Sequence, residues 1–210
     1  MAKLKLILTR HGETEWNAAH RIQGHADIEL NEKGEAQAGA LAGHLEGMEI
    51  SAIYSSDLSR ALKTAQAIAG KFPEAEFIKT SLLRERDWGA LEGHTWEQLT
   101  EKFPDDVKQM KSNSSDYAPP GGESKLTALQ RVDKFIQELA ETREGQTVVA
   151  VSHGGLSALF LRRALGLPFD TRAPFRIDNC SISELHKDES GFWVVAGMNC
   201  VCHLKKTDLI

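Results

Sequence analysis

Short apolar runs and longer helical stripes alternate along this chain. The runs that are typical of buried strands lie at residues 4–8, 51–55, 76–79, 146–151, 180–186 and 192–202. The segment Asp188-Glu-Ser-Gly191 joins the last two runs and predicts a hairpin. The first run stops abruptly at Arg10-His11-Gly12, where polar residues replace apolar ones.

Apolar residues at spacings of three and four predict helices between these strands. A stripe at 38–48 follows the cap residue Asn31, and a stripe at 58–69 follows Ser55-Ser56-Asp57, which we expect to cap that helix. Further helices are expected at 95–111 with a break near Pro104, at 126–139 after the cap Ser124, and from Gly155 onward. The Ser-, Pro- and Gly-rich stretch 112–123 predicts a mobile flap over a site.

The length of 210 residues fits one domain, which we assign to residues 1–210. A formal net charge of −5 argues against a nucleic-acid-binding protein, which would carry a basic surface. No apolar run approaches the ~20 residues of a membrane span. Met1-Ala2-Lys3 leads into the first strand without the apolar segment of a signal peptide, so we expect a cytoplasmic protein.

The chain has three cysteines, Cys180, Cys200 and Cys202, and the odd number predicts free thiols. Cys200 and Cys202 have the spacing of a soft-metal pair on one face of a strand. No second pair lies near them in the sequence, and we therefore expect them to serve in packing.

Charged and titratable residues follow four of the strand-like runs. They are Arg10 with His11, Arg60 in the helix after the second run, Glu85, and His153. If the sheet is mainly parallel, the four strand ends lie on one rim, which is where open α/β sheets bind ligands. Taken singly, each residue has a structural explanation, such as a surface charge for Arg60. Their coincidence at four strand ends favours a shared anion site.

The two arginines and two chain turns suit the binding of an anion. Arg10 and Arg60 offer rigid forks of donors that match phosphate or carboxylate oxygens. Backbone N–H groups at the helix starts after Gly12 and Gly154 would add to the site.

The other three side chains would perform the chemistry. A neutral His11 is the candidate nucleophile, because nearby arginines disfavour its protonated form. Glu85 is the candidate general acid, and His153 would stabilise charge on the transferring oxygens. Two histidines and a carboxylate also match a zinc or iron ligand set. Two arginines beside them would repel a dication, so we expect no metal.

Several ordered blocks of the sequence match motifs of a known family. They are Leu8-Thr-Arg-His-Gly-Glu-Thr-Glu-Trp-Asn17, Gln23-Gly24 with Asp27, Leu30 and Gly34, Ser55-Ser-Asp-Leu-Ser-Arg-Ala-Leu-Lys-Thr-Ala65, Leu83-Arg-Glu85 with Trp88-Gly89, Pro120-Gly-Gly-Glu-Ser124 and Val151-Ser-His-Gly-Gly155. The match spans about residues 4–165. These blocks resemble the histidine phosphatase superfamily, in its branch of cofactor-dependent phosphoglycerate mutases and related phosphatases of broad specificity.

The resemblance implies a three-layer α/β/α sandwich with a mostly parallel central sheet. It also implies that His11 attacks phosphorus and forms a phosphohistidine while Glu85 protonates the leaving alcohol. Water or a second alcohol would then take the phosphoryl group, with Glu85 acting as base. Arg10, Arg60 and His153 would hold the phosphate, and no metal or other cofactor is required.

The same resemblance implies a set of substrate contacts around the phosphate. Asn17, Gln23 and Gly24 are expected to contact the substrate, and Gly154 would contribute its backbone. Arg86 would contact a substrate carboxylate or a second phosphate.

We favour a phosphomonoesterase that acts on small phosphorylated metabolites. The stretch from Glu85 to His153 is short compared with the mutases, and Gln23-Gly24 resembles the phosphatases. The segment Glu85–Gly93 resembles the mutases, so a 2,3-bisphosphoglycerate-dependent phosphoglycerate mutase, primed by that compound, is an alternative. A fructose-bisphosphatase-like sugar phosphatase is another, and a non-catalytic phospho-ligand binding protein is the alternative of a different class. The hairpin at 180–202 would offer a sheet edge for a homodimer.

Overall fold

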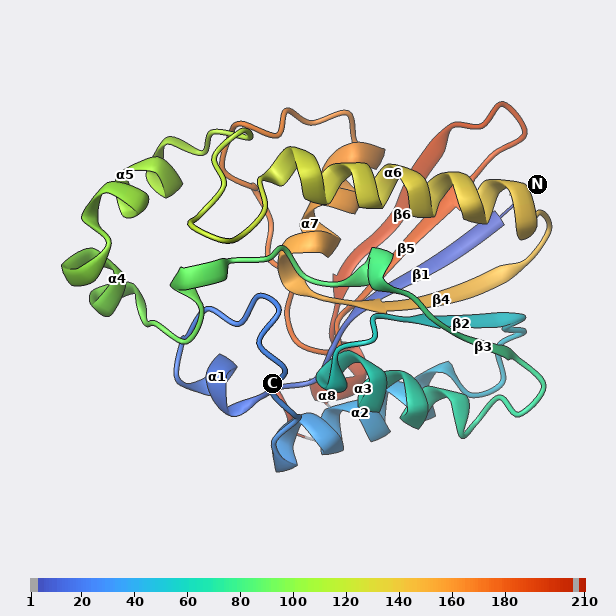
Figure 1. The fold of residues 1–210 in the computed structure, drawn as a ribbon. Coiled ribbons are helices and arrows are strands. Elements are labelled where there is room, and N and C mark those ends of the chain that lie inside the picture. The colour runs from blue at the N-terminus through green and yellow to red at the C-terminus, as the bar shows by residue number, and fades with distance from the viewer. Residues whose placement is uncertain (1–3, 206–207) are drawn as a thin grey trace.

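The computed structural model describes residues 4–205 and 208–210; residues 1–3, expected to lead into the first strand, lie outside this part. Six strands form one sheet in the order β3-β2-β4-β1-β5-β6 (Figure 1). They are β1 (Leu4–Arg10), β2 (Ala52–Ser55), β3 (Glu76–Lys79), β4 (Thr147–Ser152), β5 (Ile182–Lys187) and β6 (Trp193–Cys200). The strands β1 to β4 are parallel, and β5 and β6 form the antiparallel hairpin that the sequence predicts.

Helices cover both faces of this sheet, which makes three layers (Figure 1). One face carries α6 (Lys125–Thr142) and α7 (Gly154–Ala164), and the other carries α2 (Glu32–Leu45), α3 (Ser59–Ala69) and α8 (Cys202–Lys205). The expected α/β/α sandwich with a mostly parallel central sheet is confirmed.

The apolar run of β1 is continuous because both of its faces are buried. Successive side chains of a strand point to opposite faces. Leu6 and Leu8 accordingly pack in the core that contains Phe135 of α6, whereas Ile7 packs in the core that contains Leu41 of α2. β1 is thereby fixed at the centre of the fold, and so is the polar segment that follows it.

The helix starts agree with the sequence prediction at two places and differ at one. Asn31 and Ser124 cap α2 and α6 as expected. The expected cap at 55–57 is wrong, because α3 begins without a side-chain cap. The Asp57 carboxylate instead accepts two hydrogen bonds of 2.7 Å from the guanidinium of Arg84, and this pairing takes it away from the helix.

The chain between β3 and α6 extends beyond the carboxyl ends of the parallel strands, at the left of Figure 1. It contains α4 (Trp96–Lys102), α5 (Pro104–Ser112) and two short 3₁₀ turns (Ser81–Leu83 and Gly89–Leu91), and it lies near α1 (Glu15–Ala18). The predicted break near Pro104 is confirmed. A small separate core of Leu91, Leu99 and Val107 holds this lobe together. Within the described residues, no helix has both the length and the apolar composition needed to cross a bilayer.

Candidate active site

The end of β1 places Arg10 and His11 at the centre of the sheet's carboxyl edge. The backbone N–H of His11 donates to the carbonyl of Ser152 at 3.0 Å, which ties it to the end of β4. The next residue must be glycine, since a Cβ on Gly12 would lie 2.4 Å from the carbonyl oxygen of Gly34. The turn after β1 is therefore packed too closely to shift, and it fixes the His11 ring.

The hydrogen bonds of His11 define which ring nitrogen is available. Its Nδ1 lies 2.7 Å from the carbonyl oxygen of Gly12, and because a carbonyl only accepts, Nδ1 carries the proton. Nε2 is then left with a lone pair. Burial, together with the charges of Arg60 and Arg10, lowers the pKa of His11 well below its usual value. His11 is therefore a neutral imidazole with a nucleophilic Nε2.

Arg60, in the first turn of α3, is fully buried and orients His153. Its Nε donates to Nδ1 of His153 at 3.2 Å, and its two terminal nitrogens donate to the carbonyls of Ala26 and Gly24 at 2.7 Å. Burial lowers the pKa of Arg60 to about 10, so the guanidinium stays charged at neutral pH. Because Arg60 donates to Nδ1, the His153 ring carries its proton on Nε2, which donates to Oγ of Ser56 at 2.9 Å.

The rings of His11 and His153 lie next to each other, with centroids 5.0 Å apart. The pKa of His153 is lowered well below its usual value by burial and then by the charge of Arg60. Both histidines are therefore neutral at neutral pH, beside two guanidinium groups.

Arg10 is half-buried, and its buried Nε keeps one donor unused. Its Nη1 donates to the carbonyl of Ile177 at 2.7 Å, but its Nε has no acceptor among the residues that the structure describes. A buried, unpaired N–H costs free energy, and a phosphoryl oxygen would satisfy it. Burial lowers the pKa of Arg10, while the charge of Glu85 raises it.

Glu85 is bound at the amino end of α7. Its carboxylate accepts hydrogen bonds from the N–H of Gly155 at 2.8 Å, from that of Leu156 at 3.0 Å, and from that of Arg86 at 2.8 Å. These three donors fix the carboxylate at the first turn of α7. A Cβ on Gly155 would lie 2.5 Å from Oε1 of Glu85, so only glycine allows the carboxylate to lie there.

The structure brings His11, Arg10, Arg60, Glu85 and His153 to one place, and we call these five residues the phosphate cluster. Direct hydrogen bonds, the ring contact and the mutual electrostatic effects connect them. They come from the ends of β1 and β4, the start of α3 and the loop after β3. The chemical role of each stays a prediction at this point.

Of the three expected substrate contacts Asn17, Gln23 and Gly24, two have hydrogen-bond partners here. Oδ1 of Asn17 accepts from the backbone N–H of Thr14 at 3.2 Å, in a capping box that begins α1. Gln23 is buried, and its Oε1 has no donor within the described part of the chain. The carbonyl of Gly24 accepts from Arg60, so the Gln23-Gly24 turn acts on the phosphate cluster through that guanidinium.

Arg86 connects the loop that carries Glu85 to the segment 112–123. It is buried, its Nε and Nη2 donate to the carbonyls of Glu123 and Tyr117 at 2.8 and 2.7 Å, and its guanidinium lies 4.3 Å from the ring centre of Trp88. The expected flap at 112–123 is thus attached to the loop that carries Glu85. Gly154 lies against Arg10, where a Cβ would be 3.4 Å from Nε.

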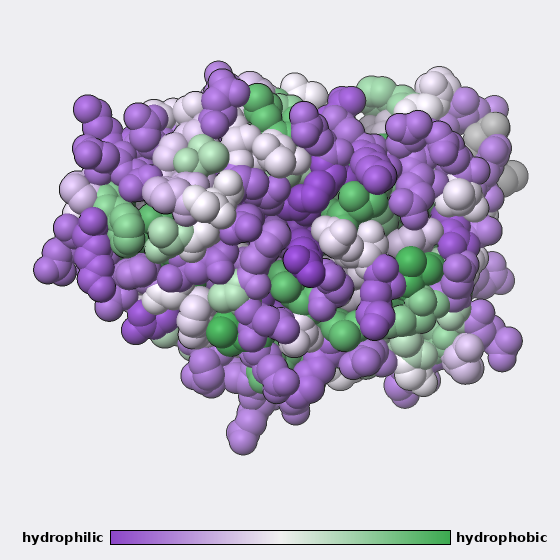
Figure 2. All heavy atoms as spheres, in the orientation of Figure 1, coloured by the Kyte–Doolittle hydropathy of each residue, from purple (hydrophilic) through white to green (hydrophobic). Residues whose placement is uncertain are grey.

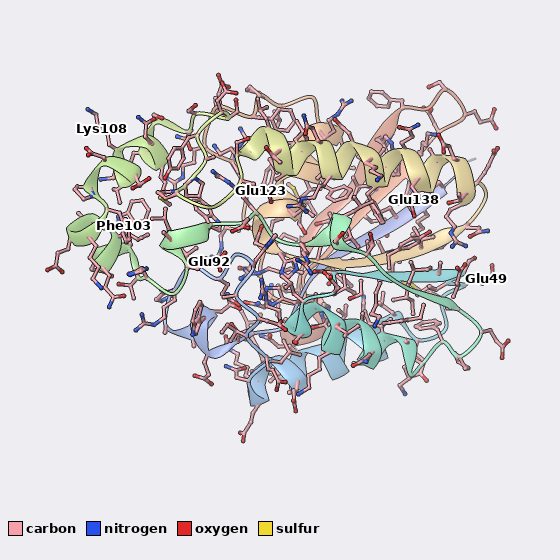
Figure 3. The ribbon with its side chains drawn as sticks, viewed as in Figure 1. Glu49, Glu92, Phe103, Lys108, Glu123 and Glu138 are labelled. Carbon is pink, nitrogen blue, oxygen red and sulfur yellow. The ribbon has the colours of Figure 1, made fainter. Side chains whose placement is uncertain are left out.

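Two glutamates that the sequence reading did not single out brace the site from the lobe (Figure 3). Glu92 accepts from the backbone N–H groups of His25 and Ala26 at 2.7 and 2.8 Å, and this turn in turn supplies carbonyls to Arg60. Glu123 is paired with Arg131, which also donates to the carbonyl of Glu85 at 3.1 Å. Neither glutamate follows a strand directly, so strand-end reasoning could not find them.

Three further polar residues contact the phosphate cluster. Oγ1 of Thr64 accepts from the N–H of Gly12 at 3.1 Å, Ser56 accepts from His153, and Nδ2 of Asn179 donates to the carbonyl of His11 at 2.9 Å. Ser56 follows β2 and could have been found by the strand-end argument. Thr64 lies inside a helix but within the Ser55–Ala65 block that matches the family motif, whereas Asn179 lies in a loop where no sequence signal marks it.

A polar cleft of about 600 Å³ opens beside the phosphate cluster. Arg10, Asn17, Arg21, Arg176 and Asp178 are among the residues that line it. Polar side chains also cover most of the face seen in Figure 2. A substrate bound to Arg10 would extend into a cleft whose walls suit polar, charged groups.

Comparisons with known proteins agree with this geometry. The model of the histidine phosphatase superfamily (branch 1) matches residues 6–200. Phosphoglycerate mutase-like protein 4 of Arabidopsis thaliana is 35% identical over 98% of this chain and 89% of its own. The solved structure of Bacillus stearothermophilus YhfR matches with a TM-score of 0.89 and 33% identity, over 96% of this chain and 99% of that one. Phosphoserine phosphatase of Entamoeba histolytica, solved with 3-phosphoglyceric acid, matches with a TM-score of 0.85 and 34% identity, over 96% and 99%. The chain belongs to the histidine phosphatase superfamily.

Proposed function

We propose that this protein is a phosphomonoesterase that hydrolyses small phosphorylated metabolites through a phosphohistidine at His11. The observation that carries the proposal is the neutral His11, with its Nε2 lone pair, buried beside two guanidinium groups. Buried cations attract a phosphate dianion, and a neutral imidazole can attack it. Few other reactions need both buried cations and a neutral nucleophilic imidazole in one pocket.

In the first step, Nε2 of His11 attacks phosphorus, and the bond from phosphorus to the alcohol oxygen breaks. The free Nε–H of Arg10 and the N–H of Gly154, which has no intrahelical acceptor in the first turn of α7, donate to phosphoryl oxygens. Glu85 gives a proton to the leaving alcohol. A bound phosphate dianion next to Glu85 favours the protonated carboxyl group, so substrate binding prepares the acid.

In the second step, water attacks phosphorus and the bond to Nε2 breaks. Glu85, now ionised, takes a proton from that water, and inorganic phosphate and neutral His11 are released. The hydrogen bonds from Gly155 and Leu156 hold the carboxylate in place in both steps. The same group thus serves as acid and then as base.

The proposed reaction uses no metal ion or other cofactor. The two guanidinium groups provide the positive charge that a metal would bring. Unchanged turnover after exhaustive treatment with EDTA supports this part of the proposal, and a loss that Mg²⁺ or Zn²⁺ restores contradicts it.

A phosphoglycerate mutase is the second candidate, because the Arabidopsis relative is named mutase-like. A mutase needs extra groups to hold the carboxylate or second phosphate of its substrate. Arg86, the residue expected to do so, already donates to the carbonyls of Glu123 and Tyr117, which favours the phosphatase. Interconversion of 3- and 2-phosphoglycerate, primed by 2,3-bisphosphoglycerate and faster than hydrolysis, would reverse this preference.

The test is to trap the intermediate. The protein is mixed with a ³²P-labelled phosphomonoester and quenched in alkali, and we expect a labelled, acid-labile, alkali-stable phosphoprotein. His11→Ala should abolish both the label and hydrolysis of p-nitrophenyl phosphate. His186→Ala, a histidine of β5 outside the phosphate cluster, is the matched control and should keep both. Hydrolysis retained by His11→Ala would refute the proposal, and binding of phosphate without turnover in the unmutated protein would support a binding protein.

The cytoplasmic location and the homodimer stay predictions. Support for a dimer comes from β6, the last strand of the sheet, where Val194 and Met198 are exposed next to Phe192. Sedimentation equilibrium should give a molar mass of twice that of one chain. The variant Val194→Lys should have the mass of a single chain. A monomer at all concentrations would exclude the dimer.

A further inference from the structure

A cluster of sulfur and imidazole side chains lies away from the phosphate cluster, in the layer of α2 and α8 (Figure 1). We call His44, Cys200, Cys202 and His203 the Cys/His cluster. The sequence showed no second ligand pair near Cys200 and Cys202, and the fold brings two histidines close to them. The last turn of α2 brings His44, and α8 brings His203, because the chain after β6 packs back against α2.

Three of the four side chains are close enough to share one ion, and the fourth, Cys200, lies beside one of them. Ligand atoms of His44, Cys202 and His203 all lie within 4.8 Å of one another. The sulfur of Cys200 lies 3.2 Å from that of Cys202. The two imidazoles are stacked, with centroids 5.1 Å apart and planes at 25°. The ligands of a tetrahedral zinc site, at bond lengths of about 2.0–2.3 Å, are separated by about 3.3–3.8 Å, so small side-chain rotations complete the set.

His203 supplies an independent sign of a missing partner. Its side chain is buried, with 6% of its surface exposed. Nε2 lies 3.0 Å from the carbonyl of Cys180 and therefore carries the proton. Nδ1, which holds the lone pair, is buried and has no donor among the described residues. An imidazole that donates one N–H to a backbone carbonyl and leaves its other nitrogen free is the usual state of a metal-binding histidine.

We propose that the Cys/His cluster binds one soft divalent cation of the Zn²⁺ class through two thiolates and two imidazoles. Zinc prefers this Cys₂His₂ donor set in tetrahedral geometry. His44, Cys200 and Cys202 are exposed, so the ion can enter from solvent. Binding converts two thiols to thiolates and releases two protons to the buffer, which balances the charge of the ion. No redox change is involved.

The bound ion would brace the segment behind the nucleophile. The carbonyl of Cys180 accepts from His203, and the backbone N–H of Cys180 donates to the carbonyl of Arg10 at 3.0 Å. The ion would also attach α8 to the last turn of α2, and nearer the start of that helix Gln37 already donates to the carbonyl of Leu209 at 2.8 Å. We therefore expect the ion to raise stability without taking part in phosphate transfer, so the proposal is independent of the proposed function.

The experiment uses the full chain, reduced with a phosphine and freed of metal by dialysis against EDTA. Zn²⁺ is titrated in competition with a chromophoric chelator, and one ion per chain is expected. Loss of a residue that only hydrogen-bonds a metal ligand lowers metal affinity about 10–100-fold. Because Cys202→Ser removes a ligand itself, it should weaken binding by more than about 100-fold. His44→Ala should weaken it as well. His186→Ala and His11→Ala are controls that should bind like the unmutated protein, which excludes the histidines of the phosphate cluster as the site.

Two further measurements keep the proposal testable if a variant does not fold. Co²⁺ in place of Zn²⁺ should give the visible absorption of tetrahedral cobalt bound to thiolates. Zn²⁺ should also protect Cys200 and Cys202 of the unmutated protein from a thiol reagent, whereas buried Cys180 should resist the reagent throughout. Equal Zn²⁺ affinity in Cys202→Ser and the unmutated protein overturns the proposal. So does labelling of Cys200 and Cys202 that Zn²⁺ leaves unchanged.

Discussion

The substitution Gly155→Ala should displace the carboxylate of Glu85 without destabilising the fold. The added methyl group would lie 2.5 Å from Oε1 of Glu85 and 3.1 Å from its Cδ. An ordinary contact between carbon and oxygen needs about 3.5 Å, so the carboxylate must retreat by about 1 Å. Because it is the far end of a flexible side chain, it can move without displacing backbone.

The displacement should reduce activity strongly and leave stability intact. Retreat breaks the hydrogen bonds of 2.8 and 3.0 Å that the carboxylate accepts from Gly155 and Leu156. A catalytic group misplaced by about 1 Å loses about 10²-fold in rate. In contrast, Ala favours a helix over Gly by up to about 1 kcal/mol, and Gly155 is exposed in the first turn of α7.

The assay compares two leaving groups. An alkyl phosphate needs a proton from Glu85 for its alcohol to leave, whereas p-nitrophenolate leaves without one. We expect kcat/KM of Gly155→Ala, which reports only the steps up to departure of the alcohol, to fall about 10²-fold on the alkyl phosphate and much less on p-nitrophenyl phosphate, at an unchanged or raised Tm. Gly39→Ala is the matched control, because a Cβ at this helical glycine of α2 meets nothing within 4 Å.

Three results would refute the reasoning. Full kcat/KM of Gly155→Ala on the alkyl phosphate would mean that the carboxylate need not lie at the start of α7. Equal losses of kcat/KM on both substrates would mean that Glu85 does not protonate the leaving group in the first step. A Tm below that of the unmutated protein would show that the methyl group moves backbone, contrary to the contact described.

Three further predictions concern the surroundings of His11. The pKa values of His11 and His153 are lowered in the fold, so the unfolded chain binds more protons below about pH 6.5. Thermal unfolding should show stability falling from about pH 6.5 toward 5, by up to about 1.4 kcal/mol per pH unit for each histidine, and His11→Gln should make the slope shallower. Arg60→Lys leaves buried carbonyls unpaired and should lower the free energy of unfolding in urea by about 2–4 kcal/mol, with at least a 10²-fold loss of kcat/KM. Arg86→Ala should release 112–123, seen as faster proteolysis there and unchanged cleavage elsewhere.

The sequence predicted the parts of the fold that follow from chain-local rules. Apolar runs identified all six strands, because both faces of the central strands are buried. The polar residues at strand ends pointed to the phosphate cluster, because parallel strands align their carboxyl ends. Arg60 was found in this way, although its complete burial could not be read from a helix stripe.

The remainder depended on contacts between distant segments. Asp57 did not cap its helix because Arg84, 27 residues later, binds it. Arg86 was expected to bind substrate, but the carbonyls of the 112–123 segment occupy two of its donors. The Cys/His cluster needed α8 to fold back on α2, which no local pattern indicates. In each case a polar side chain had several partners available, and only the tertiary arrangement selected one.

The charges of the phosphate cluster explain why one small pocket can hold both a nucleophile and an acid. Without ligand, Arg10 and Arg60 are positive, Glu85 accepts three N–H groups as an anion, and both histidines are neutral, so the pocket has an excess positive charge. Burial, together with that excess, lowers the pKa of His11 and keeps the imidazole unprotonated, as the proposed nucleophile must be. A phosphate dianion reverses the sign of the local charge, and the carboxylate then gains from taking up a proton. In the proposed reaction, the charge of the substrate thus favours the protonated Glu85 that its own leaving group requires. An uncharged ligand of the same shape would not provide this charge, and no general acid would be available.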